Sequence, residues 1–183
     1  MSILTHALND IVKKERTKEG RKPYTSMVII DAQSVKNTDT AGIKGYDAGK
    51  KVSGIKRHIG VDTNGLPHII TITAANVTDR SGALEMIEKE RENMGPVKKV
   101  LADGGYTGEK FSEAVKELID AEVEVVKRNE LHAFVVILKR WVVERSFAWL
   151  EKFRRLWKNC ERLIESSLGM VQVAFLRLLL KRT

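Results

Sequence analysis

The sequence predicts a mixed α/β fold, in which one β-sheet is flanked by helices. Short β-branched runs such as residues 28–30 are typical of buried strands. The Asn-Gly pair at 64–65 separates two β-rich runs and indicates a hairpin. Apolar residues at helical spacing then alternate with further strand-like runs, which is the pattern of an α/β sheet.

The first half of the chain supplies a helix and three strands. Residues from about Thr5 to Lys18 predict a short helix, and a basic linker, KEGRKPY, follows it. A first strand is expected at Met27–Asp31, and residues 32–55, rich in Gly, Lys, Thr and Asp, predict a long loop. The run 56–76 predicts the hairpin.

The second half alternates helices with strands. Strands are expected at 97–106 and 121–128, and helices are expected at 79–94, 107–119, 139–162 and from about 166 onward. Three strands able to pair antiparallel, followed by this alternation, are compatible with an RNase-H-like mixed sheet. We expect residues 1–24 to form an N-terminal helix and linker, and residues 25–183 to form one domain.

Composition favours a nucleic-acid partner. The 183 residues carry a formal net charge of +8, a balance that suits a polyanion. Cys160 is the only cysteine, so it has no internal disulfide partner, and a lone thiol suits a reducing cytosol. We find no signal peptide, and the apolar run 168–180 is too short for a membrane span.

Two aspartates follow strand-like runs. Asp31 ends the run VIID, and Asp103 ends the run VLAD before two glycines. Taken singly, each is most simply a turn residue, because aspartate often begins turns. Taken together they predict a site, because ligand sites of open α/β sheets gather at the carboxyl ends of strands.

A third carboxylate, Glu144, belongs to the predicted helix 139–162. A helical projection places it within a mostly cationic face that includes Arg140 and Arg155, where an exposed salt-bridged glutamate is an equally simple interpretation. Three carboxylates on a basic surface could, however, hold divalent ions for phosphodiester cleavage, and Mg²⁺ is the hard cation that such oxygen ligands prefer.

Two basic segments are candidates for phosphate contact, namely the predicted loop from Lys36 to Arg57 and the predicted helix from Lys139 to Arg162. For the loop, a solvated segment without a ligand is the alternative. Such contacts give affinity without sequence information. The three tryptophans recur every eight residues, and the second and third are expected in the buried stripe, which leaves Trp141 alone as a base-stacking candidate. The candidate DNA-binding residues are Lys36, Lys44, Lys50, Lys51, Lys56, Arg57, Arg155 and Lys158.

Five blocks of sequence carry a family resemblance that extends from about residue 20 to the C-terminus. Together they resemble the bacterial DDE insertion-sequence transposases, and within these the group named after insertion sequence five. The blocks are IIDAQSVK (29–36), KGYDAGKKVSGIKRHIGVDTNGL (44–66), AANVTDRSGA (74–83), ADGGYTGEK (102–110) and RWVVERSFAWLEKFRRL (140–156).

The resemblance implies an RNase-H-like catalytic domain whose acidic triad is Asp31, Asp103 and Glu144. It further implies that the triad holds two Mg²⁺ ions, with Mn²⁺ as a substitute. Arg140 matches the family's Tyr-Arg-Glu-Lys signature, whereas Ile137 and Glu151 replace its tyrosine and lysine. The implied activity is metal-dependent strand cleavage and strand transfer on double-stranded DNA, at element ends and target. A homo-oligomer on DNA in the bacterial cytoplasm, associated with the nucleoid and not with a membrane, is also implied.

Two alternatives stay open. Family members usually carry a further N-terminal segment, so the chain could be a downstream reading frame or a truncated copy. A catalytically incomplete fragment would then act as a DNA-binding regulator or relic. A third hypothesis is an RNase-H-like nuclease that acts on branched or hybrid substrates.

Overall fold

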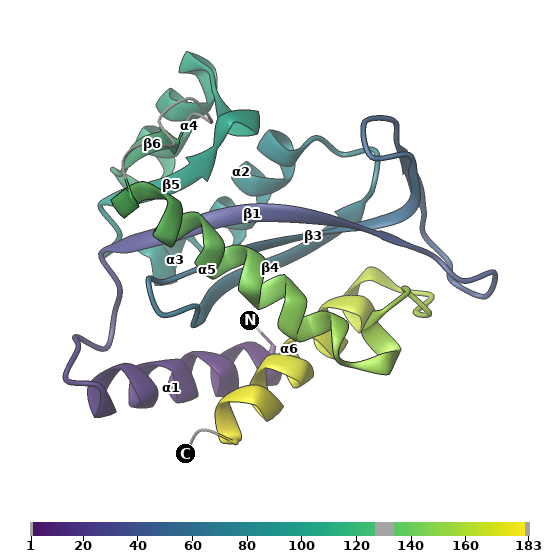
Figure 1. The fold of residues 1–183 in the computed structure, drawn as a ribbon, viewed down its shortest axis with the longest axis horizontal. Coiled ribbons are helices and arrows are strands. Elements are labelled where there is room, and N and C mark those ends of the chain that lie inside the picture. Colours follow the sequence, from purple (N-terminus) through teal and green to yellow (C-terminus); the bar gives the residue numbers. More distant parts are fainter. Residues whose placement is uncertain (1, 127–133, 182–183) are drawn as a thin grey trace.

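A single curled sheet forms the centre of the molecule (Figure 1). The computed structural model describes residues 2–126 and 134–181. Within these residues the sheet has six strands in the order β2-β3-β1-β5-β6, and β4 pairs with β3. The first three long strands pair antiparallel, whereas β5 is parallel to β1 and β6 is parallel to β5. The strands are β1 (Met27–Lys36), β2 (Gly45–Asp47), β3 (Val52–Val61), β4 (Pro67–Ala74), β5 (Lys99–Asp103) and β6 (Glu122–Val126).

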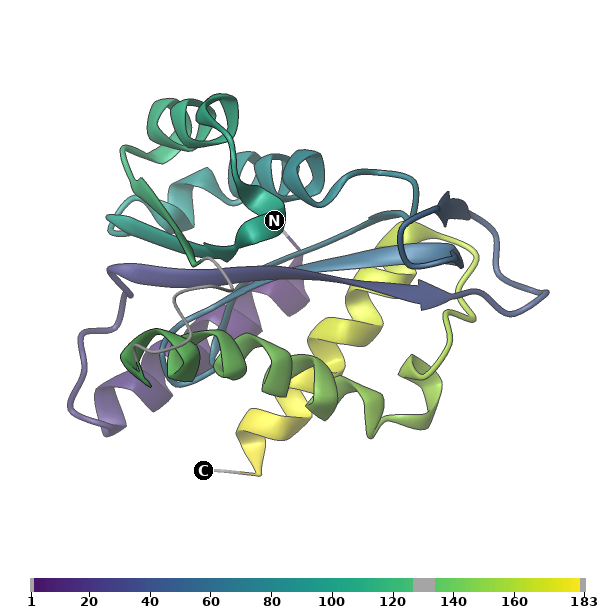
Figure 2. The same cartoon turned by 45° about the horizontal axis from the view of Figure 1, so that its top comes forward.

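Helices cover both faces of this sheet, as Figure 2 shows with the sheet between two helical layers. One layer contains α2 and α4, and the other contains α1, α5 and α6. The helices are α1 (Ile3–Lys18), α2 (Asp79–Lys89), α3 (Arg91–Met94), α4 (Glu109–Ile119), α5 (Phe134–Glu151) and α6 (Ile164–Leu180), with short 3₁₀ turns η1 (Gly104–Tyr106) and η3 (Arg154–Leu156). None of the described helices is both long and apolar enough to cross a membrane.

Two hydrophobic cores follow from this layering. Val28 and Ile30 of β1 pack in the core beneath α2 and α4, whereas Ile29 packs in the core beneath α1, α5 and α6. A strand covered on both faces needs apolar residues at consecutive positions, which explains the unbroken run in β1. Leu8 and Val12 of α1 belong to the second core, so the N-terminal helix packs on the rest of the chain.

The first strand is longer than predicted. We expected it to end at Asp31, with a loop over 32–55, but β1 continues to Lys36 and pairs with β3 from Ile29 to Lys36. The predicted loop also contains the short strand β2 and the start of β3. Hydrogen bonding to β3 therefore holds the polar residues after Asp31 in a strand that their own propensities do not favour.

The long C-terminal helix is shorter than predicted. We expected helix over 139–162, but α5 ends at Glu151 and the chain turns through η3 toward the end of β1. There the amide of Asn159 donates to the carbonyl of Lys36 at 2.8 Å, and the amide of Thr38 donates to the carbonyl of Asn159 at 2.8 Å. These contacts with a distant strand compete with continued helix, and α6 begins only at Ile164.

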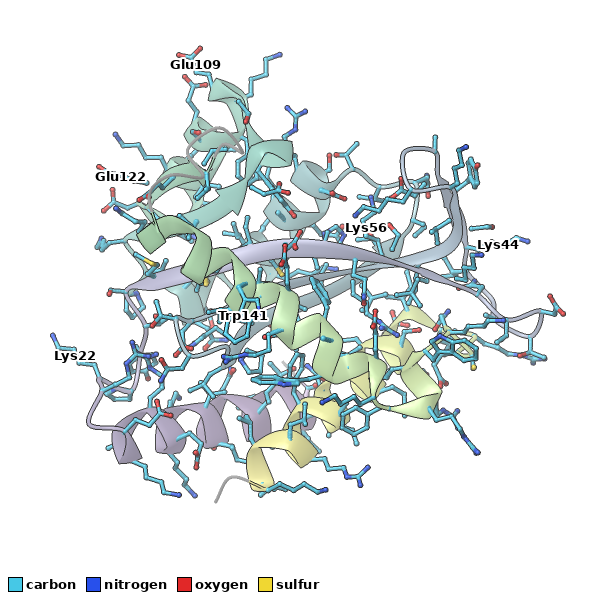
Figure 3. All side chains as sticks on the ribbon, viewed as in Figure 1. Lys22, Lys44, Lys56, Glu109, Glu122 and Trp141 are labelled. Atoms are coloured by element: carbon cyan, nitrogen blue, oxygen red, sulfur yellow. The ribbon has the colours of Figure 1, made fainter. Side chains whose placement is uncertain are left out.

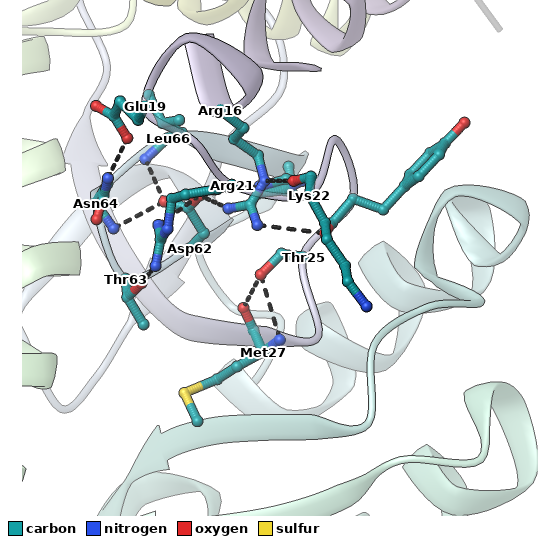
Figure 4. Close-up of polar contacts among 12 residues, drawn as sticks. Arg16, Glu19, Arg21, Lys22, Thr25, Met27, Asp62, Thr63, Asn64 and Leu66 are labelled. Atoms are coloured by element: carbon teal, nitrogen blue, oxygen red, sulfur yellow. Dashed lines mark hydrogen bonds and ion pairs between the residues drawn. The ribbon is translucent and has the colours of Figure 1, made fainter. Parts of the chain in front are cut away.

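Asp62, in the turn between β3 and β4, ties this turn to α1 (Figure 4). Its carboxylate is fully buried and accepts hydrogen bonds from the amides of Asn64 and Leu66, at 2.9 and 3.0 Å. It also accepts a hydrogen bond from the guanidinium of Arg16. Burial opposes ionisation, but His68 and the two amides favour it and hold the pKa of Asp62 below its ordinary value.

We predict that Asp62→Asn lowers the free energy of unfolding by about 3 kcal/mol or more, because Arg16 is then left buried without its counter-charge. Urea denaturation measures the effect. The matched control is Asp10→Asn, which breaks an exposed pair with Lys13 at 3.8 Å and is expected to cost less than about 1 kcal/mol. Equal losses for the two variants would contradict the assigned role of Asp62.

A second buried polar group, His58, lies between β4 and α2. The Thr73 hydroxyl donates to the carbonyl of Ala74, so it accepts from His58 Nε2 at 3.0 Å. Gly82 of α2 faces the ring so closely that any Cβ there would collide with it. Burial lowers the pKa of His58 to about 4, although the nearby charge of Asp79 opposes this shift.

His58 should make folding pH-dependent in mildly acidic solution. The unfolded chain protonates an ordinary histidine near pH 6.5, whereas the folded protein resists protonation down to about pH 4. Stability is therefore unaffected by this group above pH 7 and falls as the pH drops below about 6.5. We expect a loss of about 2 kcal/mol between pH 7.5 and pH 5, measured by urea denaturation at each pH. His58→Asn should flatten that slope, and an unchanged slope would contradict the assignment.

Candidate active site

The sheet brings Asp31 and Asp103 together. The parallel ladder of β1 and β5 pairs Ile29 with Leu101, and each aspartate lies two residues beyond its member of that pair. Side chains alternate along a strand, so both carboxylates point to the face that α5 covers. Both residues line one small pocket with Val143 of α5. The fold thus places two residues that are far apart in the sequence in one pocket.

Each aspartate also makes a local backbone contact. Asp31 accepts a hydrogen bond from the amide of Ala32 at 2.7 Å, and Asp103 accepts one from the amide of Gly105 at 2.8 Å. Asp103 therefore begins a turn, as the simpler interpretation of the sequence had it, and η1 follows directly. Asp31 differs, because β1 continues past it, so its carboxylate lies within a strand and not at its end.

Glu144 approaches from α5, the helix that crosses in front of β1 in Figure 1. It is exposed and lines a hollow of about 380 Å³ with Ala32, Gln33 and Lys50. Glu144 is therefore beside the part of β1 that follows Asp31. Arg140 belongs to the same helix, but its side chain lies outside the described part of the structure, as does that of Ile137.

The three carboxylates do not form a closed metal cage. Among residues 2–126 and 134–181, no three acidic, histidine or cysteine side chains gather closely enough to hold one ion. The donor set still suits a hard divalent cation, because two adjacent strands present aspartate oxygens on one face and the helix over that face presents a glutamate. Adjacent strands bring Asp31 and Asp103 to one pocket, and the place of Glu144 depends on the position of α5.

The contacts of α5 with the β3–β4 turn fix that position. Arg145, next to Glu144, donates to the carbonyl of Asn64 at 2.9 Å. The hydroxyl of the fully buried Ser146 lies 3.5 Å from the carbonyl of Gly65, but it donates its one proton to the nearer carbonyl of Val142, at 3.1 Å. Gly65 has a φ of +81°, a backbone conformation that favours glycine and that the Asn-Gly signal anticipates. Arg145 thus attaches α5 to the turn at the position directly after Glu144.

Tyr106 is a site residue that the sequence interpretation did not single out. It is buried, and its hydroxyl has no hydrogen-bond partner among the described residues. Burial raises the pKa of Tyr106, and the charges of Asp31, Asp79 and Asp103 raise it further, so the phenol stays neutral near these carboxylates. The motif ADGGYTG, which places it three residues after Asp103, is the sequence signal that could have identified it.

An ion-pair network supports the far side of the site. The ammonium of Lys56 lies 2.7 Å from Asp79 and 3.2 Å from Asp47. Ser34 donates to Asp47 at 2.6 Å, and this bond, against the effect of burial, holds the pKa of Asp47 well below its ordinary value. Lys50 donates to the carbonyl of Ala32 at 3.1 Å, so its ammonium binds the residue that directly follows Asp31. The sequence did not lead us to predict that Asp47 or Asp79 belongs to the site.

The candidate DNA-binding residues separate into two groups. The prediction that Lys56 and Arg57 contact DNA is wrong, because these residues are only 4% and 2% exposed. Both are bonded within the protein, so neither is available to DNA. Figure 3 shows Lys44, by contrast, at the outer end of the sheet. The members that reach the surface are Lys36, Lys44, Lys50, Lys51, Arg155 and Lys158.

The tryptophans also depart from expectation. Trp157 was expected in the buried stripe, but it is 70% exposed because α5 ends before it. Trp141 is exposed on α5 (Figure 3), and the guanidinium of Arg145 lies 4.7 Å from its ring centre and equally far from that of Trp149. A cation thus occupies the space between those two rings, which leaves Trp157 as the more accessible indole.

The six-stranded mixed sheet with helices on both faces is the fold of RNase H-like catalytic cores. Two solved structures share this fold. The simian T-cell lymphotropic virus intasome aligns with a TM-score of 0.52 and 16% identity over 83% of this chain and 47% of the other. The catalytic core domain of BIV integrase aligns with a TM-score of 0.52 and 12% identity over 81% of this chain and 82% of the other. At these identities the likeness shows the fold.

Sequence comparison shows the family. The transposase DDE domain model matches residues 23–179, so the chain belongs to that family. A protein of Burkholderia cepacia assigned as the transposase for insertion sequence element IS402 is 37% identical over 116 residues, which is 60% of this chain and 54% of that protein. The chain therefore spans about half the length of this relative.

Proposed function

We propose that the chain cleaves DNA strands at the ends of an insertion sequence and joins them to target DNA. The observation that carries the proposal is that Asp31 and Asp103, on neighbouring strands of a transposase DDE domain, line one pocket beneath the helix that bears Glu144. In this reaction water attacks a phosphodiester to free a 3′-hydroxyl at the element end. That hydroxyl then attacks a phosphodiester of the target.

The acidic residues are proposed as the metal ligands. The DDE family implies divalent metal, and we propose two Mg²⁺ ions, with Mn²⁺ as a substitute, held by Asp31, Asp103 and Glu144. Such ions supply an activated oxygen nucleophile and stabilise the leaving oxygen. We assign Arg140 to positioning Glu144 or contacting a phosphate.

The surface lysines are proposed to hold double-stranded DNA, both the element ends and the target. Assembly as a homo-oligomer on DNA is part of the proposal, and the intasome likeness of the fold supports it. We further propose membership of the group named after insertion sequence five, a catalytic domain over 25–183, and work in the bacterial cytoplasm on the nucleoid. The sequence blocks listed above support the group.

Replacing a proposed metal ligand should abolish cleavage and leave DNA binding intact. We expect Asp103→Asn and Glu144→Ala each to reduce nicking of element-end DNA in Mg²⁺ by at least about a hundredfold, because the ions lose a ligand. Gel analysis of end-labelled DNA measures this, and binding is measured in parallel without divalent ions. Glu161→Ala, which removes a carboxylate paired with Arg155, is the control that should cleave normally. Normal cleavage by either ligand variant would eliminate the mechanism.

The phosphate contacts should appear in the salt dependence of binding. Each phosphate contact that is removed reduces the slope of log affinity against log salt by about 0.9. We therefore expect Lys44→Gln and Lys51→Gln each to reduce the slope by roughly that amount, measured by fluorescence anisotropy on duplex DNA. Lys89→Gln, on α2 and paired with Glu85, is the control that should leave the slope unchanged. An unaltered slope in both test variants would remove these lysines from the interface.

A DNA-binding regulator without catalytic activity is the second candidate function. One observation favours it, namely that the described residues hold no group of three metal-ligating side chains. Purified protein incubated with Mg²⁺ and element-end DNA separates the two. Binding without nicking across a range of metal concentrations would support the regulator, and nicking that depends on Asp103 would support the enzyme.

A further inference from the structure

A groove leads from Glu144 along β1 toward β2. It consists of three adjoining hollows of about 380, 470 and 530 Å³. Gln33 and Glu151 line both the first hollow, which contains Glu144, and the second. Lys36 lines both the second and the third, which ends at β2. The shared residues make the hollows one continuous feature, which we call the β1 groove.

Cations are placed along the whole β1 groove. Lys50 lies in the first hollow beside Glu144, Lys36 and Lys158 lie in the second, and the third contains two further lysines at the hairpin of β2 and β3. These lysines are exposed at the surface. Three carboxylates also line the groove, and they are Asp39, Glu144 and Glu151. The lysines outnumber them, so the groove has a net positive charge suited to phosphates.

Two exposed aromatic rings line the same groove. Trp157 in the second hollow is 70% exposed, and Tyr46 in the third is 56% exposed. The ammonium of Lys158 lies 5.6 Å from the centre of the Trp157 ring. Aromatic faces beside lysines in a groove are the pattern by which proteins bind unpaired nucleic acid, with bases stacked on the rings and phosphates on the cations.

The floor of the second hollow holds Trp157 in place. Arg57 is buried there, and it donates to the carbonyl of Leu156 at 2.7 Å and to Gln33 at 3.4 Å. Gln33 in turn donates to Glu151 at 2.8 Å. Arg57 thus holds the backbone of the residue before Trp157. A groove whose aromatic wall is anchored in this way is pre-organised for a ligand.

We propose that the β1 groove binds an unpaired stretch of DNA that continues from the strand held at the carboxylates. An unpaired strand fits better than a duplex, because the bases of a duplex are stacked on one another and cannot offer their faces to Trp157 and Tyr46. The inference rests on the proposed function, since it takes DNA as the ligand of the neighbouring site. It adds that the protein holds DNA in which base pairing has been opened.

The test compares three DNAs in buffer without divalent ions, where no cleavage occurs. They are a blunt duplex, the same duplex with a single-stranded extension of about 10 nucleotides, and the isolated single strand. Fluorescence anisotropy of labelled DNA measures each affinity. We expect the extended duplex to bind more tightly than the blunt duplex. Equal affinities would overturn the inference, and this outcome would leave the cleavage experiment on Asp103 unaffected.

The variants test which residues carry the preference. Trp157→Ala and Tyr46→Ala should each weaken binding of the extension by about tenfold, as the loss of one stacked base does, and leave the blunt duplex unchanged. Trp157→Phe should keep most of the affinity. Trp141→Ala, which removes an exposed indole outside the groove, should have no effect. Thermal denaturation verifies that each variant folds. Unchanged binding in both alanine variants, or equal losses on blunt and extended DNA, would overturn the inference.

Discussion

The register of β1 between β3 and β5 is the constraint on which the rest of the site depends. β3 pairs with β1 from Ile29 to Lys36, and β5 pairs with β1 from Met27 to Ile29, so β1 is fixed on both sides. A slip of one residue would turn Asp31 to the opposite face and separate it from Asp103. The buried residues before Asp31 alternate between two covered cores and oppose such a slip. Packing of apolar side chains thus determines where the acidic ones lie.

Local patterns predicted most of the fold, and distant partners decided the rest. The Asn-Gly turn and the β-branched runs predicted the strands and the hairpin, because each signal is complete within a few residues. The second half of β1 was missed because residues such as Gln33 and Ser34 become strand only through their pairing with Arg57 and Lys56. The end of α5 was missed for the same reason, since Asn159 bonds to β1.

The candidate site shows the same division. Asp31 and Asp103 could be predicted, because each follows a strand-like run, and a parallel pairing of those runs brings them together. Lys56 and Arg57 could not be separated from the surface lysines by charge. Their burial depends on partners elsewhere in the chain, such as Asp79 and Leu156. The helical periodicity likewise could not show that Trp157 lies beyond the helix end.

The short turn between β3 and β4 serves two elements at once. Its Asp62 receives Arg16 from α1, while its Asn64 carbonyl receives Arg145 from α5. The helix at the beginning of the chain and the helix that bears Glu144 therefore contact the same turn. The loss of this turn's contacts would therefore loosen α1 and α5 together, although the two helices lie far apart in the sequence.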